Sequence, residues 1–208
     1  MKNLNEHDAL TQAYFDKWAA WFEQAGFAFK YFQKRVISLS GLRQGSVFLD
    51  LGCGTGWAVR YAERLLQGRG RFIGIDISAK MIEKAKELAA GSEKIVFHHA
   101  NAENLPLKSN SVDTCICTFS FHHYLHPGKV LSEVRRVLKP NGRFYILDGT
   151  PDDPLIRLVD RAAAKLEKSH VRQYSTSEFR HMFQKAGLQY VKSKVILFYP
   201  IKVHIAGK

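Results

Sequence analysis

An acidic residue near the end of an apolar run, followed by glycines at alternate positions, is the feature of this sequence best suited to chemistry. The residues are Asp50, Gly52, Cys53, Gly54 and Gly56. Glycine allows the torsions of a tight strand-to-helix turn, and its missing side chain lets the backbone pass close to a ligand. A helix over residues 57–67 would direct its amide groups toward that ligand. The spacing predicts a loop that holds a nucleoside cofactor.

A dinucleotide-binding loop is the main alternative, because its glycine fingerprint also joins a strand to a helix. That fingerprint requires glycine where Trp57 stands. A pyrophosphate would also lie poorly beside the carboxylate of Asp50, two residues before the first glycine. An acid at this position favours a cationic ligand instead.

With this loop, several segments resemble the class I S-adenosylmethionine (SAM) methyltransferases, whose first motif is an acid followed by G-x-G-x-G and whose ligand carries an ammonium and a sulfonium. The later segments are Asp76-Ile77-Ser78, the segment from Ala100 to Leu107, the segment from Ser111 to His122-His123-Tyr124, and Glu133-Val134-Arg135-Arg136-Val137-Leu138-Lys139-Pro140. The two segments that start at Ala100 and Ser111 resemble the branch that includes the ubiquinone and menaquinone biosynthesis methyltransferases. The resemblance covers residues 48–148 and implies SAM as cofactor, with S-adenosylhomocysteine as product.

The resemblance also implies roles for residues after the second and third expected strands. Asp76 would accept both ribose hydroxyls, Ile77 would pack on the adenine, and Met81 could add to that apolar face. The adenine edge would be read by Asn101, Ala102 and Glu103. The family pattern has aspartate at position 101, and a neutral amide accepts a hydrogen bond more weakly, so weaker cofactor affinity is expected. By themselves, Asp76 could be a turn residue and Met81 plain core.

The end of the fourth expected strand should face the methyl donor, because open α/β sheets bind ligands outside the carboxyl ends of their strands. This places Thr118 and Phe119 against the cofactor and Tyr124 near the acceptor. His122 and His123 are candidates for a catalytic base, since neutral histidine suits proton transfer near pH 7. Two hypotheses stay open: one histidine removes a proton from the acceptor, or the pair only shapes the strand end.

No metal-ligand pattern accompanies this site, so metal-free chemistry is expected. His98 and His99 are adjacent on an expected strand, where their side chains point to opposite faces and cannot share one metal ion. The cysteines number three, and small buried core residues are the simplest interpretation of Cys115 and Cys117.

The N-terminal segment carries five aromatic residues between positions 14 and 22. In the resembling family this segment is a lid over the cofactor cleft, which makes Tyr14 and Trp18 candidates for contact with substrate or donor. Excluding water there would favour the reaction, because a sulfonium and a neutral nucleophile lose charge separation as they react. A helix that merely buries these aromatics on the sheet is the equal alternative.

Strand and helix patterns alternate along the chain, which predicts a Rossmann-like, doubly wound α/β domain. Seven strands are expected in a mostly parallel sheet, closed by an antiparallel hairpin over residues 190–198 and 201–205. The sequence also predicts a helix over 79–90 capped by Ser78, a strand over 143–148, and a capping box at Ser175-Thr176-Ser177-Glu178. The 208 residues of the chain suit one domain. This domain would consist of a helical N-terminal segment at 1–45, a SAM-binding half at 46–150, and substrate-side helices with the hairpin at 151–208.

Charge and hydropathy limit the partners and the location. The net charge of +12 would attract nucleic acid or an anionic membrane surface, but the basic residues interleave with apolar ones at helical spacing, which favours solvated helix faces. No apolar run is long enough to span a bilayer, and the first residues lack the apolar stretch of a signal peptide, so a cytoplasmic protein is expected.

The function expected from these features is transfer of the SAM methyl group to a small-molecule acceptor, such as a quinone or a lipid. Two alternatives stay open: a nucleic-acid methyltransferase, and a SAM-binding protein without activity. Against the first, the chain has Thr118-Phe119-Ser120-Phe121 where amino-methylating enzymes carry an N/D-P-P-Y/F segment.

Overall fold

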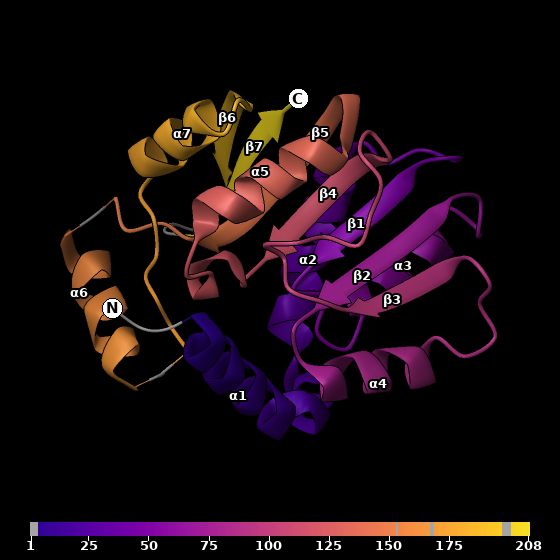
Figure 1. Ribbon diagram of the computed structural model, residues 1–208, viewed down its shortest axis with the longest axis horizontal. Helices are drawn as coiled ribbons and strands as arrows, with labels where there is room; N and C mark the ends of the chain where they lie inside the picture. Colours follow the sequence, from indigo (N-terminus) through magenta and orange to yellow (C-terminus); the bar gives the residue numbers. More distant parts are fainter. Residues whose placement is uncertain (1–3, 153, 167–168, 197–200) are drawn as a thin grey trace.

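The computed structural model describes residues 4–152, 154–166, 169–196 and 201–208, with the side chains of residues 4–5, 18–25, 155, 159 and 163–166 outside that description. Helices and strands alternate through most of the chain (Figure 1). In chain order they are α1 Leu4–Ala25, α2 Phe27–Ser40, β1 Val47–Leu51, α3 Trp57–Leu65, β2 Arg71–Asp76, α4 Ala79–Leu88, β3 Ile95–His99, β4 Val112–Thr118, the 3-10 helix η1 Phe121–His123, α5 Pro127–Val137, β5 Leu138–Gly149, α6 Pro154–Leu166, α7 Thr176–Lys185, β6 Gln189–Val195 and β7 Ile201–Gly207.

A sheet of seven strands forms the centre of the fold, in the order β3-β2-β1-β4-β5-β7-β6. Strands β1 to β5 pair in parallel, while β7 pairs antiparallel with both β5 and β6. The chain adds strands on one side of β1 and then on the other, which leaves a crevice at the carboxyl ends of β1 and β4. The predicted doubly wound sheet and closing hairpin are confirmed.

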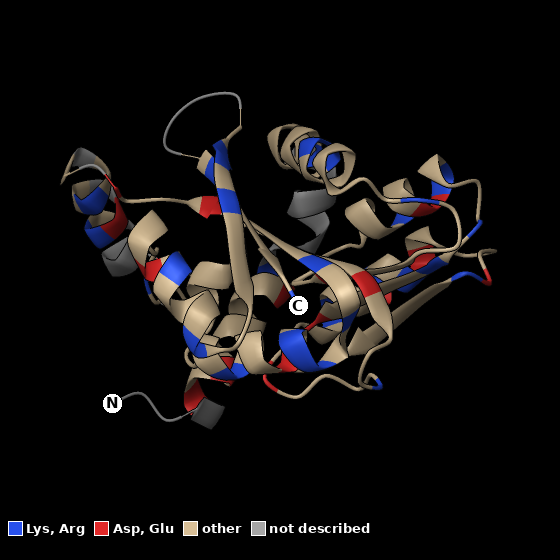
Figure 2. Cartoon of the chain, turned by 90° about the horizontal axis from the view of Figure 1, so that it is seen from above, with Lys and Arg blue, Asp and Glu red and all other residues tan. Residues whose placement is uncertain are grey.

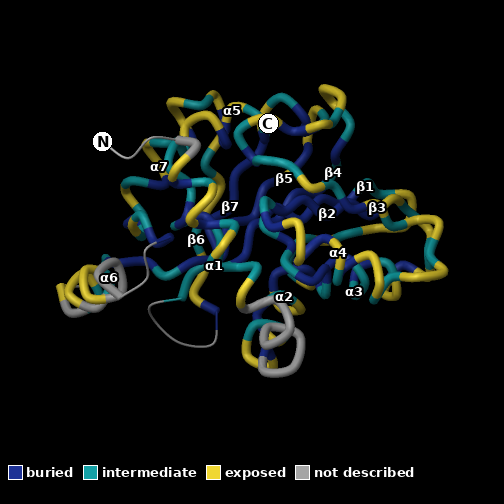
Figure 3. The backbone as a smooth tube through the Cα atoms, turned by 60° about the horizontal axis from the view of Figure 1, so that its bottom comes forward, coloured by how far each residue is buried: buried dark blue, intermediate teal, exposed yellow. Residues whose placement is uncertain are grey.

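An apolar core lies on each face of the sheet. The central strands are accordingly buried along most of their length (Figure 3). Successive strand residues point to opposite faces, so in β1 Phe48 packs with α2, α3 and α4, whereas Leu49 and Leu51 pack with α5 and α7. Strands buried on both faces explain the near-continuous apolar runs of the sequence. The ligand-binding edge of the sheet is therefore held by rigid packing on both sides.

Capping side chains start two of the helices as predicted. Ser78 Oγ accepts a hydrogen bond from the N–H of Met81 at 3.1 Å, and Ser175 and Glu178 form a reciprocal capping box. Both patterns satisfy amide groups that have no partner within the helix.

Several predicted element bounds are wrong by a few residues. The helix expected over 57–67 ends at Leu65, because Gln67 takes left-handed torsions with φ 51°. The helix expected over 79–90 ends at Leu88. Strand β5 starts at Leu138 instead of residue 143, since Asn141, with φ 69°, lies in an irregular stretch of the ladder to β4 instead of separating two elements. The first strand of the predicted hairpin extends to position 198, which lies outside the described residues.

A charged pair on α5 braces the loop that follows β3. Arg136 donates to the carbonyl oxygens of Leu105 at 3.0 Å and Leu107 at 2.7 Å. Glu133 accepts from the N–H of Leu105 at 2.8 Å and pairs with the Arg136 guanidinium at 2.7 Å. The E-x-x-R motif thus has a structural explanation: it positions a loop at the edge of the crevice.

Basic residues are spread over many elements, as Figure 2 shows, instead of gathering on one helix or strand. This arrangement agrees with the interpretation of the +12 net charge as solvated faces. None of the helices in the described part of the chain has the length and apolarity that crossing a bilayer requires.

Candidate active site

A cavity of about 490 Å³ lies at the crevice, between the strand ends and helices α1 and α2. Most predicted site residues line it, namely Tyr14, Gly52, Cys53, Gly54, Asp76, Ile77, Met81, Asn101, Ala102, Glu103, Thr118, Phe119, His122, His123 and Tyr124. Asp50 and Gly56 do not contribute to the lining that the described residues form. The side chain of Trp18 lies outside the described residues.

The three glycines of the loop after β1 have different surroundings, although all have positive φ, at 69°, 52° and 75°. A Cβ on Gly52 would lie 2.0 Å from Ser120 Oγ, and one on Gly56 would lie 2.5 Å from Phe97 Cζ. A Cβ on Gly54 would meet one sulfur atom at 3.9 Å and otherwise open space. Gly54 thus leaves room for a ligand, whereas the other two allow close packing of protein against protein.

Asp76 presents a fixed carboxylate to the cavity from the end of β2. Its Oδ2 accepts from the N–H of Gly54 at 2.8 Å, and its Oδ1 accepts from the N–H of Ser78 at 2.9 Å. Burial raises the pKa of Asp76, and these backbone hydrogen bonds act in the opposite direction. A carboxylate held in this way can accept two neighbouring hydroxyls, as a ribose presents.

Asp50 is buried on β1, and neither of its carboxylate oxygens has a hydrogen-bond partner among the residues that the structure describes. Burial raises the pKa of Asp50 well above its usual range, and the negative charge of Asp76 adds to the effect. A buried carboxyl without a partner is unfavourable, so a donor or a cation near it would be stabilised.

The loop after β3 is tied to helix α1. Asn101 Nδ2 donates to Asp8 Oδ2 at 2.7 Å, while Asn101 Oδ1 accepts from the N–H of Glu103 at 2.8 Å. Glu103 also pairs with His126 at 3.0 Å, and His126 does not belong to the lining formed by the described residues.

Helices α1 and α2 form the roof of the cavity. On α1, His7 Nε2 donates to the carbonyl oxygen of His123 at 2.8 Å, and Asp16 accepts from the N–H of Lys80 at 3.3 Å. On α2, Gln33 donates to Thr118 Oγ1 at 3.1 Å. The lining residues from these two helices are His7, Asp8, Thr11, Tyr14, Phe15, Phe29, Lys30 and Gln33, and Gly26 between the helices also lines the cavity.

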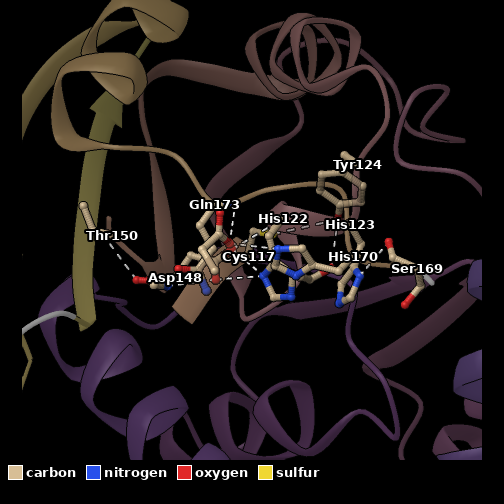
Figure 4. A network of polar contacts seen from close by, with 12 residues as sticks. Cys117, His122, His123, Tyr124, Asp148, Thr150, Ser169, His170 and Gln173 are labelled. Carbon is tan, nitrogen blue, oxygen red and sulfur yellow. Dashed lines mark hydrogen bonds and ion pairs between the residues drawn. The ribbon is translucent and has the colours of Figure 1, made fainter. Parts of the chain in front are cut away.

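Three imidazoles lie together beside the cavity, from His122 and His123 on η1 and His170 in the segment after α6 (Figure 4). Both carboxylate oxygens of Asp148, at the end of β5, lie within reach of His122 Nδ1, at 2.8 and 2.9 Å. Asp148 Oδ2 also accepts the backbone N–H of His122 at 3.1 Å. His170 pairs separately with Asp160 at 2.8 Å.

His123 differs from His122 in its surroundings. Burial lowers the pKa of His123 well below its usual range, and the neighbouring His122 acts in the same direction. Its Nδ1 lies 3.2 Å from the carbonyl oxygen of Ser169, and Phe15 packs edge-on against its ring. The structure therefore keeps His123 neutral and packed, while His122 is held by a carboxylate. Within the described segments, no group of three His, Cys, Asp or Glu is arranged to hold a metal ion.

The turn after β4 is strained and packed. Phe119 has φ 51°, a conformation that a bulky side chain rarely adopts, and its ring packs edge-on against Phe29 and Phe32 of α2. Tyr124 Oη lies 3.3 Å from Ser120 Oγ. Burial raises the pKa of Tyr124 well above its usual range, so its phenol is neutral at pH 7.

Comparison with known proteins agrees with this geometry. The family described as "Methyltransferase domain" matches residues 49–146. The uncharacterized methyltransferase YcgJ of Bacillus subtilis is 35% identical over 159 residues, which span 74% of this chain and 62% of that relative. Its solved structure superposes with a TM-score of 0.69 at 31% identity, covering 79% of this chain and 71% of that one. The chain belongs to the class I SAM-dependent methyltransferases.

Two further proteins share most of their length with this chain. The demethylmenaquinone methyltransferase of Lactiplantibacillus plantarum is 29% identical over 203 residues, which span 86% of this chain and 85% of that relative. A protein described as "the putative methyltransferase", solved in complex with the Haloferax volcanii Trm112 methyltransferase activator, superposes with a TM-score of 0.79 at 22% identity over 93% of this chain and 96% of that one, which shows the fold.

SAM is the cofactor of this family, and the site suits it. The fixed Asp76 carboxylate matches the ribose hydroxyls, the open space at Gly54 admits a ligand, and the unpartnered Asp50 carboxyl matches a ligand that carries positive charge.

The sequence indicated the N-terminal helix through Tyr14 but not the contribution of α2 to the site. Phe29, Lys30 and Gln33 of α2 line the cavity, and the only sequence signal was the aromatic-rich run at residues 27–32. Asp8 and Asp148 were also missed, because nothing local distinguishes them from other surface or strand-end acids.

Proposed function

We propose that this chain transfers the SAM methyl group to an apolar, planar small-molecule acceptor that carries an ionisable hydroxyl or amine. The observation that carries the proposal is a cavity that runs from Asp76 to His122 beneath two helices. One end of this cavity suits a nucleoside, and the other end suits an acceptor.

Aromatic rings form part of the cavity lining. They come from the roof helices, from α3 and from the turn after β4, namely Tyr14, Phe15, Phe29, Trp57 and Phe119. Flat apolar rings favour a flat apolar ligand by stacking and by burial of apolar surface. The relative named demethylmenaquinone methyltransferase agrees with an acceptor of the quinone class.

When bound, SAM supplies a methyl group activated by its sulfonium. The chain then has to hold the acceptor atom in line with that methyl group and to exclude water, because positioning supplies much of the rate in such displacements. Helices α1 and α2 serve as the lid in this proposal, since they roof the cavity with polar contacts to Thr118 and His123.

His122 is the proposed proton acceptor. With its Nδ1–H donated to the Asp148 carboxylate, the neutral ring carries its lone pair on Nε2, which is the tautomer that a base needs. Asp148 also holds the backbone N–H of the same residue, so the ring is oriented by three contacts to one carboxylate. His123 has a packing role, because it is buried and neutral.

Calorimetric titration with SAM, S-adenosylhomocysteine and NAD tests the cofactor half. The first two should bind and NAD should not, and Asp76→Ala should abolish binding. A screen of hydroquinones, phenols and amines with methyl-labelled SAM then tests the acceptor half. Failure of the ligand-free protein to bind either SAM or its product would refute the proposal.

Removal of residues 1–22 tests the lid. We expect weaker SAM binding and slower turnover, since Asp8 and Asp16 would be lost with their contacts to the cofactor side of the sheet. Unchanged binding and turnover would show that the helix only covers the sheet.

A further inference from the structure

Asn101 uses both ends of its side-chain amide within the protein. Its Oδ1 accepts from the N–H of Glu103 at 2.8 Å, and its Nδ2 donates to Asp8 Oδ2 at 2.7 Å. The first bond fixes the loop after β3, and the second reaches across to helix α1. The amide orientation is therefore set, and the carbonyl of Asn101 is already engaged.

Asp8 brings a carboxylate to the place where the base of a nucleoside would lie. Asp76 would hold the ribose, and Ile77, Met81, Asn101 and Asp8 line the same cavity. The ends of β2 and β3 are neighbours in the sheet, because Asp76 pairs with His99. A purine placed on this apolar surface turns its edge toward the end of β3. The exocyclic amino group of adenine is a donor and requires an acceptor there.

The local charges explain why residue 101 is an amide. Burial raises the pKa of Asp8, the hydrogen bond from Asn101 lowers it, and the charge of Glu103 raises it. Aspartate at position 101 would add a third carboxylate beside Asp8 and Glu103, whereas asparagine donates a hydrogen bond. The amide at 101 and the acid at 8 form a matched pair across 93 residues of sequence.

We propose that Asp8, on the lid helix, is a cofactor-specificity residue: its carboxylate accepts the amino group of adenine, and Asn101 holds it in place. This inference rests on the proposed function, because it assumes SAM in the cavity. The acid that reads the adenine is then supplied by α1 instead of the loop after β3, so cofactor binding and closure of the lid stabilise each other.

The test compares S-adenosylhomocysteine with S-inosylhomocysteine, which carries an oxo group in place of the amino group. Calorimetry on the full chain should show that the wild type prefers the adenine ligand by about tenfold or more, since a buried donor or acceptor without a partner is strongly disfavoured. Asp8→Asn should remove most of this preference, because its amide can turn to donate to the oxo group. Asp8→Ala should weaken the binding of S-adenosylhomocysteine more than that of S-inosylhomocysteine.

Three further variants separate recognition from folding. Asp16→Asn weakens a different contact of α1, with the N–H of Lys80, so it should weaken the binding of both ligands equally and keep their affinity ratio. Asn101→Asp should weaken both ligands by repulsion, and the double change Asp8→Asn with Asn101→Asp should restore the preference for adenine, because the donor and the acid have exchanged places.

The outcomes distinguish this inference from the proposed function. Loss of the ligand preference in Asp8→Asn with intact thermal unfolding supports the role of Asp8. Binding of both ligands with the same ratio in wild type and Asp8→Asn overturns it and leaves the proposed function standing. A wild type that binds neither ligand overturns both.

Discussion

Alanine substitutions at Gly54 and Gly56 should separate cofactor binding from folding. Both glycines have positive φ, at 52° and 75°. An L-residue in the left-handed region costs about 1–2 kcal/mol, and the lower entropy of the unfolded alanine chain offsets about 0.4–1 kcal/mol of that. The backbone contribution is therefore about 1 kcal/mol in either variant.

The added methyl group makes the difference. At Gly56 it would lie 2.5 Å from Phe97 Cζ and 3.1 Å from the Cβ of Ala85, so β3 or α4 must move. Overpacking of this kind costs about 1–3 kcal/mol, which brings Gly56→Ala to about 2–4 kcal/mol in total. At Gly54 the methyl group meets only a sulfur atom at 3.9 Å, so Gly54→Ala should remain near 1 kcal/mol.

Urea unfolding and SAM calorimetry measure the two effects. Gly54→Ala should stay nearly as stable as wild type but bind SAM at least about tenfold more weakly, a loss of about 1.4 kcal/mol, because the methyl group occupies ligand space. Gly56→Ala should lower the free energy of unfolding. Adding Phe97→Leu to the Gly56→Ala variant should restore part of that loss, because the smaller side chain relieves the contact with the added methyl group. Equal destabilisation by the two substitutions, or wild-type SAM binding by Gly54→Ala, would refute the reasoning.

Three other substitutions have defined outcomes. Asp148→Asn should lower turnover on an identified acceptor by about 10²–10⁴-fold, because His122 would no longer be held in the tautomer that accepts a proton on Nε2, and calorimetry should show unchanged SAM affinity. Equal turnover in the variant and the wild type would exclude His122 as the base. Asp50→Asn should leave unfolding by urea close to wild type and weaken SAM binding, since the buried carboxyl that it replaces has no hydrogen-bond partner among the described residues and would interact with a cationic ligand; a large loss of stability would contradict this. Burial lowers the pKa of His204 to about 4, below its unfolded value of 6.5, so the unfolded chain binds the proton more tightly and stability falls as pH drops from about 6.5 toward 4. Between pH 7 and 5, wild type should lose about 2 kcal/mol more than His204→Gln in urea titrations, and parallel curves would show that His204 does not titrate in this way.

Local features of the chain were predicted well from the sequence. The strand ending at Asp76 and the caps at Ser78 and Ser175 are confirmed, because a strand period and a side-chain cap depend on neighbours within a few residues. Element ends were less accurate, as at Leu65 and Leu138, since a helix or ladder ends where its tertiary partners allow.

Residues that act in pairs could not be predicted. The contact of His122 with Asp148 spans 26 residues, and that of Asn101 with Asp8 spans 93. No periodicity or motif links such positions, because only the folded sheet brings the ends of β4 and β5 together and only the docking of α1 brings Asp8 to the loop. The sequence showed that Asn101 stands where the family pattern has aspartate. The consequence of this difference depends on the carboxylate of Asp8, which comes from helix α1.

The order of residues alone was sufficient for the fold, the family and the cofactor class, since a strand, a glycine loop, a helix and a second acid-ended strand follow each other within 30 residues and act largely through backbone geometry. Tertiary structure decided which of two residues of the same type contacts a ligand or a catalytic partner and which one packs within the protein. Gly54 leaves ligand space while Gly56 packs on Phe97, and His122 meets a carboxylate while its neighbour His123 is buried. The physical reason is that a backbone torsion belongs to one residue, whereas free space, burial and charge belong to the neighbours that folding brings.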